Sequence, residues 1–294
     1  MTGLIQTLIL GILVGGVYAL LASGLTVIFG VMRIINIAHG ALMIMGAFIT
    51  YTLWKQVGLD PLVGFVITMI VMFGIGWAIY LVAVRPVRRA PVTTSVLLTF
   101  GLAFFLEGVM GFIWGNNAVA SRPSYVETSF ELGPFYFPQG LFYGCLLAVV
   151  ILVALQMVFS RTWLGRSIRA SASSEDAARL VGVNIPMVAA ITFAIGAASA
   201  GAGGSIISIM GTFVPGMQIL WIARMLSIVV LGGLGSFPGA VIRALILGVG
   251  EALVATYISP IWSPALSIIL IFVILVVRPQ GLMGTKLRED VAQT

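Results

Sequence analysis

Ionisable side chains interrupt the long apolar stretches of this sequence at a few positions: His39, Glu107, Arg224, Arg243 and Glu251. Charged groups are costly inside a membrane, so each of them should face other helices, a partner protein or water. A proton or sodium relay ordinarily needs several acids in close register. The two carboxylates lie in separate apolar stretches, so we expect Glu107 and Glu251 to accept hydrogen bonds between helices.

The two arginines of this set are expected at the membrane boundaries. Arg243 closely follows Pro238 at the start of its apolar stretch, so its long side chain can extend to the cytoplasmic surface. Arg224 lies near the outer start of its own stretch and can extend to the opposite surface. No ion pair at mid-membrane is evident from the sequence.

Residue combinations that catalyse reactions or hold cofactors are missing from the sequence. It contains one histidine and one cysteine, Cys145, too few for a Cys/His metal site or a disulfide framework. The stretch GGLGSFPG resembles a phosphate-binding loop only in its glycines, because it lacks the lysine and the preceding strand. No nucleophile is paired with a base. The chain is therefore predicted to move a solute rather than to transform one, with no metal and no cofactor of its own.

The longest charged interruption is RTWLGRSIRASASSEDAARLVGVNIP, at residues 161–186. Ser173 and Asp176 have the spacing of a capping box, which predicts a short helix that begins at Ser174. Gly182 is expected to end this helix because glycine adopts the left-handed conformation at helix ends.

Within the predicted helix, Glu175 and Arg179 can pair across one turn. A helix this short is not stable alone in water, so flanking spans must hold it or another protein must bind it. A rigid, capped helix suits a subunit that takes its energy from a soluble partner. The alternatives are an ordinary solvated loop in a self-powered carrier or channel, or a purely structural membrane protein.

The composition is that of a membrane protein. Of the 294 residues, 60% are hydrophobic and 8% are charged, and the mean hydropathy is +1.16. Such a chain is too apolar for a water-soluble fold. Its net charge of +6 comes from short loops between apolar stretches, a pattern that orients membrane proteins and does not indicate nucleic-acid binding.

The fold class is therefore all-α, a polytopic transmembrane bundle with about 8–10 spans. Residues 1–294 are expected to form a single transmembrane domain with a cytoplasmic loop at 161–185, the N-terminus outside and the C-terminus inside. The stretch 221–231 is too short to cross unaided and could be a broken or re-entrant helix. The apolar stretches expected to form spans are 4–30, 38–54, 62–84, 92–114, 141–159, 186–210, 221–231, 240–258 and 263–277.

Small residues should bring some of these helices into close contact. Gly11 and Gly15 are placed to admit another helix against the first span, and GAASAGAGGS in the span 186–210 permits backbone contact.

Several motifs together carry a resemblance to a known family. DAARLVG at 176–182 resembles the EAA motif of binding-protein-dependent ABC importer permeases, with Asp in place of the usual Glu. Further motifs occur in order along the chain: GLTVIFGVMRIINIAHGALMIMGAF, RPVRRAP, GRSIRA, LGGLGSFPGA and RPQGLMG. The set resembles the LivH-type permeases of branched-chain amino acid ABC importers over nearly the whole chain. Two departures are Arg243, where relatives usually carry a small residue, and Glu107, where Gln is more usual.

The resemblance implies an assembly in the bacterial inner membrane. Its members would be a second, LivM-type permease subunit, two cytoplasmic ABC ATPases that bind ATP and Mg, and a periplasmic substrate-binding protein. The implied substrates are branched-chain or other small amino acids, and related permeases serve urea, short amides or aromatic acids. An ion-coupled secondary transporter is the alternative from another class.

The same resemblance assigns site residues. Near the translocation path or its inner gate it places Asn36, His39, Gly232, Gly233 and Gly235. It implies that the loop helix is the coupling helix, with ATPase contacts at Glu175, Asp176, Ala177, Ala178, Arg179 and Gly182.

Overall fold

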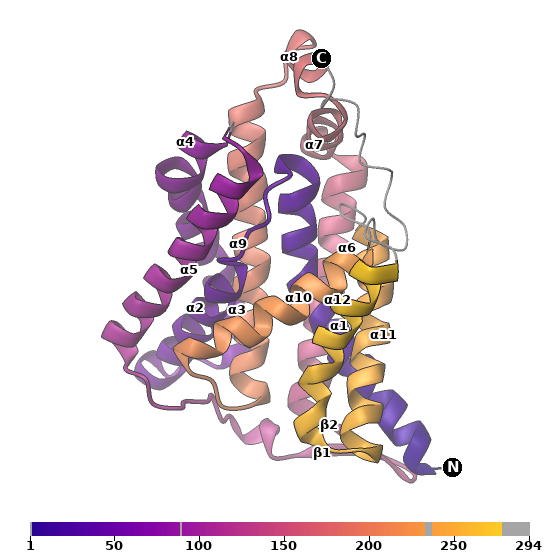
Figure 1. Ribbon diagram of the computed structural model, residues 1–294. Coiled ribbons are helices and arrows are strands. Elements are labelled where there is room, and N and C mark those ends of the chain that lie inside the picture. Colours follow the sequence, from indigo (N-terminus) through magenta and orange to yellow (C-terminus); the bar gives the residue numbers. More distant parts are fainter. Residues whose placement is uncertain (1, 89, 233–236, 278–294) are drawn as a thin grey trace.

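The computed structural model describes residues 2–88, 90–232 and 237–277, which form a helical bundle (Figure 1). The helices are α1 (Thr2–Met32), α2 (His39–Thr52), α3 (Pro61–Ile79), α4 (Arg85–Val87), α5 (Val92–Trp114), α6 (Gln139–Arg161), α7 (Trp163–Ser173), α8 (Glu175–Leu180), α9 (Ile185–Met210), α10 (Gln218–Gly232), α11 (Phe237–Tyr257) and α12 (Ser263–Val277), with 3₁₀ turns at Ser124–Val126, Pro215–Met217 and Pro260–Trp262. Single π-helical turns, Leu53–Val57 and Tyr80–Val84, extend α2 and α3.

Each apolar stretch expected to form a span corresponds to a helix, but the helices differ in length. Within the described ranges, six helical segments are long and apolar enough to cross a membrane: Thr2–Met32, Pro61–Val87, Val92–Trp114, Gln139–Arg161, Ile185–Met210 and Phe237–Tyr257. In contrast, α10 and α12 have 15 residues each, fewer than the roughly 20 that a span needs. Helix α2 has 14 residues before the π turn that continues it to Val57. The expected short helix at 221–231 is confirmed as short, although it begins earlier, at Gln218.

Segments expected on opposite sides of the membrane lie at opposite ends of the bundle. Figure 1 shows α4, α7 and α8 at one end, and the start of α1 with the strands at the other. The strands β1 (Ser129–Leu132) and β2 (Phe135–Pro138) form an antiparallel hairpin that turns at Gly133, whose φ is +61°. The hairpin lies where the sequence predicted only an outer loop.

The loop that precedes the hairpin is fixed to the start of α3. Asp60 caps α3 by accepting a hydrogen bond from the Leu62 N–H at 2.8 Å, and the Tyr125 hydroxyl donates to the same carboxylate at 3.1 Å. Burial and the neighbouring Asp60 charge raise the pKa of the Tyr125 phenol. It therefore stays protonated near neutral pH and remains a donor to Asp60.

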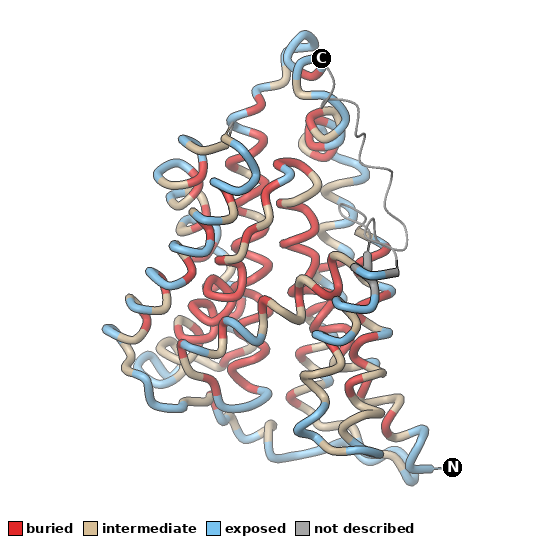
Figure 2. The backbone as a smooth tube through the Cα atoms, viewed as in Figure 1, coloured by how far each residue is buried: buried red, intermediate tan, exposed pale blue. Residues whose placement is uncertain are grey.

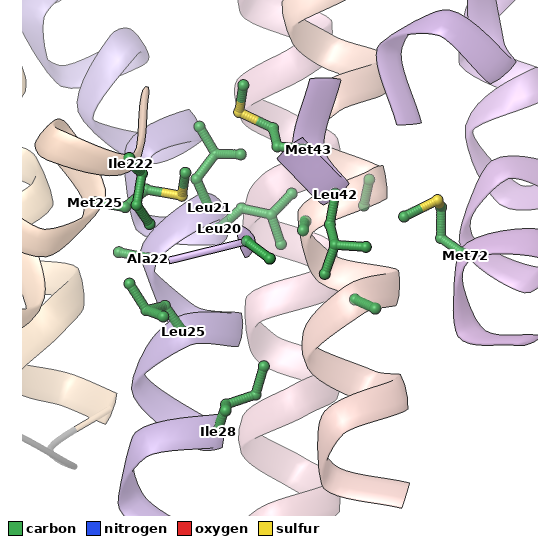
Figure 3. Close-up of a cluster of buried hydrophobic side chains, with 14 of the residues drawn as sticks. Leu20, Leu21, Ala22, Leu25, Ile28, Leu42, Met43, Met72, Ile222 and Met225 are labelled. Carbon is green, nitrogen blue, oxygen red and sulfur yellow. The ribbon is translucent and has the colours of Figure 1, made fainter. Parts of the chain in front are cut away.

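The centre of the bundle consists of the second half of α1 with α2 and α9, which are buried on nearly all sides (Figure 2). Figure 3 shows Leu20 of α1 close to Leu42 of α2, and both side chains are 0% exposed. By contrast, α5 presents large apolar side chains outward, such as Phe112, which is 93% exposed. This distribution suits a membrane protein, whose outer helices contact lipid tails.

Glycines allow the central helices to touch through their backbones, as the sequence predicted. A Cβ atom added to Gly204 of α9 would lie 2.0 Å from the Met43 carbonyl oxygen of α2, and one added to Gly46 would lie 2.4 Å from the Gly201 Cα. One added to Gly15 of α1 would lie 2.7 Å from a Cα atom of α11. Neither pair of helices can separate or rotate freely without losing these contacts.

Candidate functional site

The short loop helix α8 forms as predicted, but it begins one residue later than the capping box suggested. Its cap is Ser174, whose hydroxyl accepts a hydrogen bond from the Ala177 N–H at 3.3 Å. The predicted cap, Ser173, is instead the last residue of α7, because the Ser174 N–H still bonds to the Ala170 carbonyl at 3.1 Å. The sequence did not predict α7, although Thr162 supplies its N-terminal cap.

Gly182 ends α8, which confirms the prediction. Its φ is +83°, a conformation that glycine adopts without strain. The Gly182 N–H bonds to the Arg179 carbonyl and the Val183 N–H to the Ala178 carbonyl, both at 3.0 Å. This pair of bonds is a Schellman motif, which satisfies carbonyls that a helix end leaves open.

The surface of α8 is apolar at its tip. Leu180 and Val181 are 89% and 74% exposed, and neither was among the predicted contact residues. Ala178 is only 2% exposed, so it packs inward and is not on the free surface of the helix. The remaining predicted contact residues are exposed or half-buried: Glu175, Asp176, Ala177, Arg179 and Gly182.

An ion pair fixes the base of α8 to the rest of the bundle. Glu175 pairs with Arg179 at 3.7 Å, as its spacing predicted, and it also pairs with Arg88, just after α4. The pairing of Arg88 with Glu175 was not predicted from the sequence, although the excess of positive charge in RPVRRAP was a signal for a carboxylate partner. The end of α8 that contains Glu175 is therefore held, while the tip projects.

The segment between α1 and α2 places unpaired polar atoms in the middle of the bundle. Asn36 and His39 are both 0% exposed. The His39 Nε2 lies 3.2 Å from the Leu21 carbonyl oxygen, whereas its Nδ1 and both side-chain polar atoms of Asn36 have no hydrogen-bond partner among the described residues. No described side chain caps α2, whose first residue is His39. The Asn36 and His39 side chains therefore carry buried hydrogen-bonding atoms that no described residue uses.

The start of α10 meets the start of α2 at this level. A Cβ atom added to Gly40 would lie 2.4 Å from the Gln218 carbonyl oxygen, so the two backbones touch there. The Gln218 side chain donates to Glu107 at 3.1 Å, which confirms the interhelical hydrogen bond expected of that carboxylate. Its own Oε1 has no partner within the described part of the chain. Asn36, His39 and Gln218 thus belong to one region, the α2–α10 junction.

A second buried polar region surrounds Glu251, which is 4% exposed. Its carboxylate accepts hydrogen bonds from the Tyr18 hydroxyl at 2.7 Å, the Ser267 hydroxyl at 2.7 Å and the Arg224 Nε at 3.1 Å. These residues join α1, α10, α11 and α12. The expectation that Glu251 bonds between helices is confirmed, and we call the four residues the Glu251 cluster.

Two expectations about arginines are wrong. Arg224 does not extend to the outer boundary, because it pairs with Glu251 and its side chain is only 15% exposed. An ion pair therefore does exist inside the bundle, between residues 27 positions apart. Arg243 is 7% exposed instead of extending into water. Its helix packs closely against α1, which covers one side of it.

The predicted gate glycines can be described only in part. Gly232 is the last residue of α10, whereas Gly233 and Gly235 lie outside the described residues.

Near the α8 end of the bundle, a cavity of about 300 Å³ opens between α1, α6, α7 and α11. Its lining includes Thr26, Gly30, Gln156 and Arg169.

Comparisons with known proteins identify the family of this chain. A family model described as "Branched-chain amino acid transport system / permease component" matches residues 7–277. The high-affinity branched-chain amino acid transport system permease proteins LivH of Escherichia coli and BraD of Pseudomonas aeruginosa are 30% and 31% identical to this chain, and each alignment covers 95% of both proteins. A probable LivH of Methanocaldococcus jannaschii is 25% identical over 93% of this chain and 90% of its own length. The chain therefore belongs to the family of permease components of branched-chain amino acid transport systems.

Proposed function

We propose that this chain is the membrane-spanning permease subunit of an ATP-driven importer for branched-chain or other small amino acids. The observation that carries the proposal is the projecting helix α8, capped at both ends, with Leu180 and Val181 exposed at its tip. Apolar side chains at the end of a rigid helix suit insertion into a groove of another protein. The nearby ion pair between Glu175 and Arg88 would transmit a movement of α8 to the end of α3.

The partners follow from the family and from what the chain lacks. The part of the chain that the structure describes has no nucleotide-binding loop and no group of three metal-ligating side chains. Two cytoplasmic ABC ATPases would supply ATP, Mg and movement, a LivM-type permease would complete the pathway, and a periplasmic binding protein would deliver the substrate. In this assembly the chain lies in the bacterial inner membrane, with α8 and the C-terminus in the cytoplasm.

The solute path in this proposal passes the α2–α10 junction. An amino acid carries a carboxylate, an ammonium group and, in this class, an apolar side chain. The Asn36 amide can donate to the carboxylate and accept from the ammonium group, and the start of a helix favours negative charge. Asn36 is fully buried here, so α2 and α10 must separate before a solute reaches it. The glycines at 232, 233 and 235 would permit that movement as the inner gate.

The test is leucine uptake into proteoliposomes that contain the chain with its ATPases, partner permease and binding protein. A double variant, Leu180→Asp with Val181→Asp, should lose uptake, substrate-stimulated ATP hydrolysis and co-purification of the ATPases, while it still inserts into the membrane. Leu132→Asp is the matched control, because Leu132 is 71% exposed at the opposite end of the bundle.

Undiminished co-purification and uptake in the double variant would refute the coupling role of α8. A second arm contains the chain alone with an imposed proton or sodium gradient. Accumulation of leucine in that arm, without ATP, would support the ion-coupled alternative.

A further inference from the structure

A basic pocket lies beside the base of α8, where the end of α3 meets the start of α9. Its volume is about 210 Å³, and its lining comprises Tyr80, Arg85, Pro86, Arg88, Arg179 and Pro186. We call it the arginine pocket. The coupling role of α8 uses Arg88 and Arg179 only as partners of Glu175, and neither that role nor the solute path assigns a ligand to the pocket.

Positive charge in this pocket exceeds the negative charge that balances it. Glu175 is the carboxylate that pairs with Arg88 and Arg179. Arg85 forms no ion pair with any described residue. Three guanidinium groups therefore share one carboxylate, so an anion that entered the pocket would meet a net positive field.

Two buried polar groups in the pocket have no partner of their own. The Tyr80 side chain is 1% exposed, and neither its hydroxyl nor the Arg88 Nε has a hydrogen-bond partner among the described residues. Buried donors without partners are uncommon because each loses its bonds to water. Both could donate to the oxygens of a phosphate, as arginine does in many anion sites.

The pocket continues into an apolar groove. A second hollow, of about 190 Å³, shares Tyr80, Arg85 and Pro186 with the arginine pocket. It adds four apolar residues and one polar one: Trp77, Leu81, Met187, Ala190 and Asn184. Leu81 and Met187 are 41% and 48% exposed, on the outer surface of membrane-spanning helices. An occupant that fills both hollows has an anionic head and an apolar chain.

We propose that an anionic phospholipid binds here, with its phosphate in the arginine pocket and an acyl chain along the apolar groove. Basic pockets between transmembrane helices on the cytoplasmic side suit anionic headgroups. The phosphate would take up the unused charge of Arg85 and the free donors of Tyr80 and Arg88. Because Arg88 and Arg179 also hold Glu175, the bound lipid would stiffen the attachment of α8 to the bundle.

The experiment measures lipid retained by the purified protein, by native mass spectrometry, after exchange into nanodiscs of phosphatidylglycerol or of phosphatidylcholine. The wild-type chain should retain phosphatidylglycerol in preference to phosphatidylcholine. Arg85→Gln should lower the retained phosphatidylglycerol about fivefold, the factor that corresponds to one lost arginine near an anionic lipid. Tyr80→Phe should lower it by a smaller factor, through loss of the buried donor.

Arg166→Gln is the matched control, because Arg166 is an exposed arginine of α7 at the same end of the bundle and does not line the pocket. It should retain as much phosphatidylglycerol as the wild-type chain. Arg85 is itself exposed, so its variant should fold, which circular dichroism in detergent would verify.

Equal retention of the two lipids, or an equal loss in the Arg85 and Arg166 variants, would overturn the proposal. A further arm adds inorganic phosphate and phosphatidylglycerol together, at equal concentrations, to the delipidated protein. If the phosphate reduces the amount of bound phosphatidylglycerol, the site recognises the phosphate only, and the acyl-chain part of the proposal fails.

Discussion

Two buried polar regions of this protein differ in how completely their groups are paired. In the Glu251 cluster, the carboxylate accepts bonds from a phenol, a hydroxyl and a guanidinium on three other helices. At the α2–α10 junction, the Asn36 side chain is equally buried but has no partner among the described residues. Both residues are buried, so burial alone does not explain the difference.

The difference indicates different roles. A fully paired buried charge holds its helices in one arrangement, because separating them would leave the charge without partners. An unpaired buried amide costs about 1–3 kcal/mol, a cost that a solute could remove by binding in another conformation. We therefore expect substitutions in the Glu251 cluster to reduce stability first, and substitutions at Asn36 to reduce transport first.

The largest effect is expected from Glu251→Ala. The substitution leaves the Arg224 guanidinium buried without its carboxylate, which costs about 3–5 kcal/mol. Thermal unfolding in detergent should show a strongly lowered midpoint. Glu107→Gln is the control, because an amide oxygen can still accept the Gln218 bond. If Glu251→Ala does not change the midpoint of thermal unfolding, the Glu251 cluster does not hold the helices together.

A smaller loss of stability is expected from Gly204→Ala, which tests the backbone contact between α9 and α2. The added Cβ would lie 2.0 Å from the Met43 carbonyl oxygen, and such overpacking costs about 1–3 kcal/mol. The control is Gly74→Ala on α3, where an added Cβ would meet no atom within 4 Å. If both variants unfold at the wild-type temperature, α2 and α9 are not in close backbone contact at Gly204.

Tyr18→Phe should reduce stability less, by about 1–2 kcal/mol. It removes one donor from Glu251 and leaves the other two in place. Combined with Glu251→Ala, it should add little further loss, since the bond is already absent. An additive double variant, measured by the same unfolding assay, would show that Tyr18 acts independently of the carboxylate.

No loss of stability is expected from Asn36→Leu, because no protein hydrogen bond is lost and the unpaired buried amide is removed. Leucine uptake by the reconstituted importer should nevertheless fall to background. Asn117→Leu, in the exposed loop after α5, is the control and should transport normally. Normal uptake with Asn36→Leu would remove the junction from the proposed solute path.

Local chemistry explains which parts of this protein could be predicted. The end of α8 at Gly182 follows from backbone conformation within a few residues. Its start was misplaced by one residue because Ser173 and Ser174 are adjacent and either hydroxyl can cap a helix. The hairpin at β1 and β2 was missed because strands this short carry too few residues for an alternating pattern.

Pairing between helices could not be predicted in the same way. Arg224 and Glu251 lie in different helices, 27 residues apart, so their contact depends on how each helix is rotated and displaced. An arginine near the end of an apolar stretch can reach either water or a neighbouring helix. The sequence alone predicted that the Arg224 side chain reaches water. The isolated charges in these apolar helices, Arg224 in α10 and Glu251 in α11, were nevertheless a signal for such a pair.

The sequence by itself determined that the chain is a helical membrane protein, where its apolar helices lie, and that a capped helix interrupts them. These properties depend on hydropathy and on hydrogen bonds between residues close in the chain. Only the tertiary structure decided that Glu251 is fully paired, that Asn36 is not, and that α2 and α10 begin side by side. Those properties depend on the packing of distant helices, in which a rotation by one residue exchanges the side chains that meet.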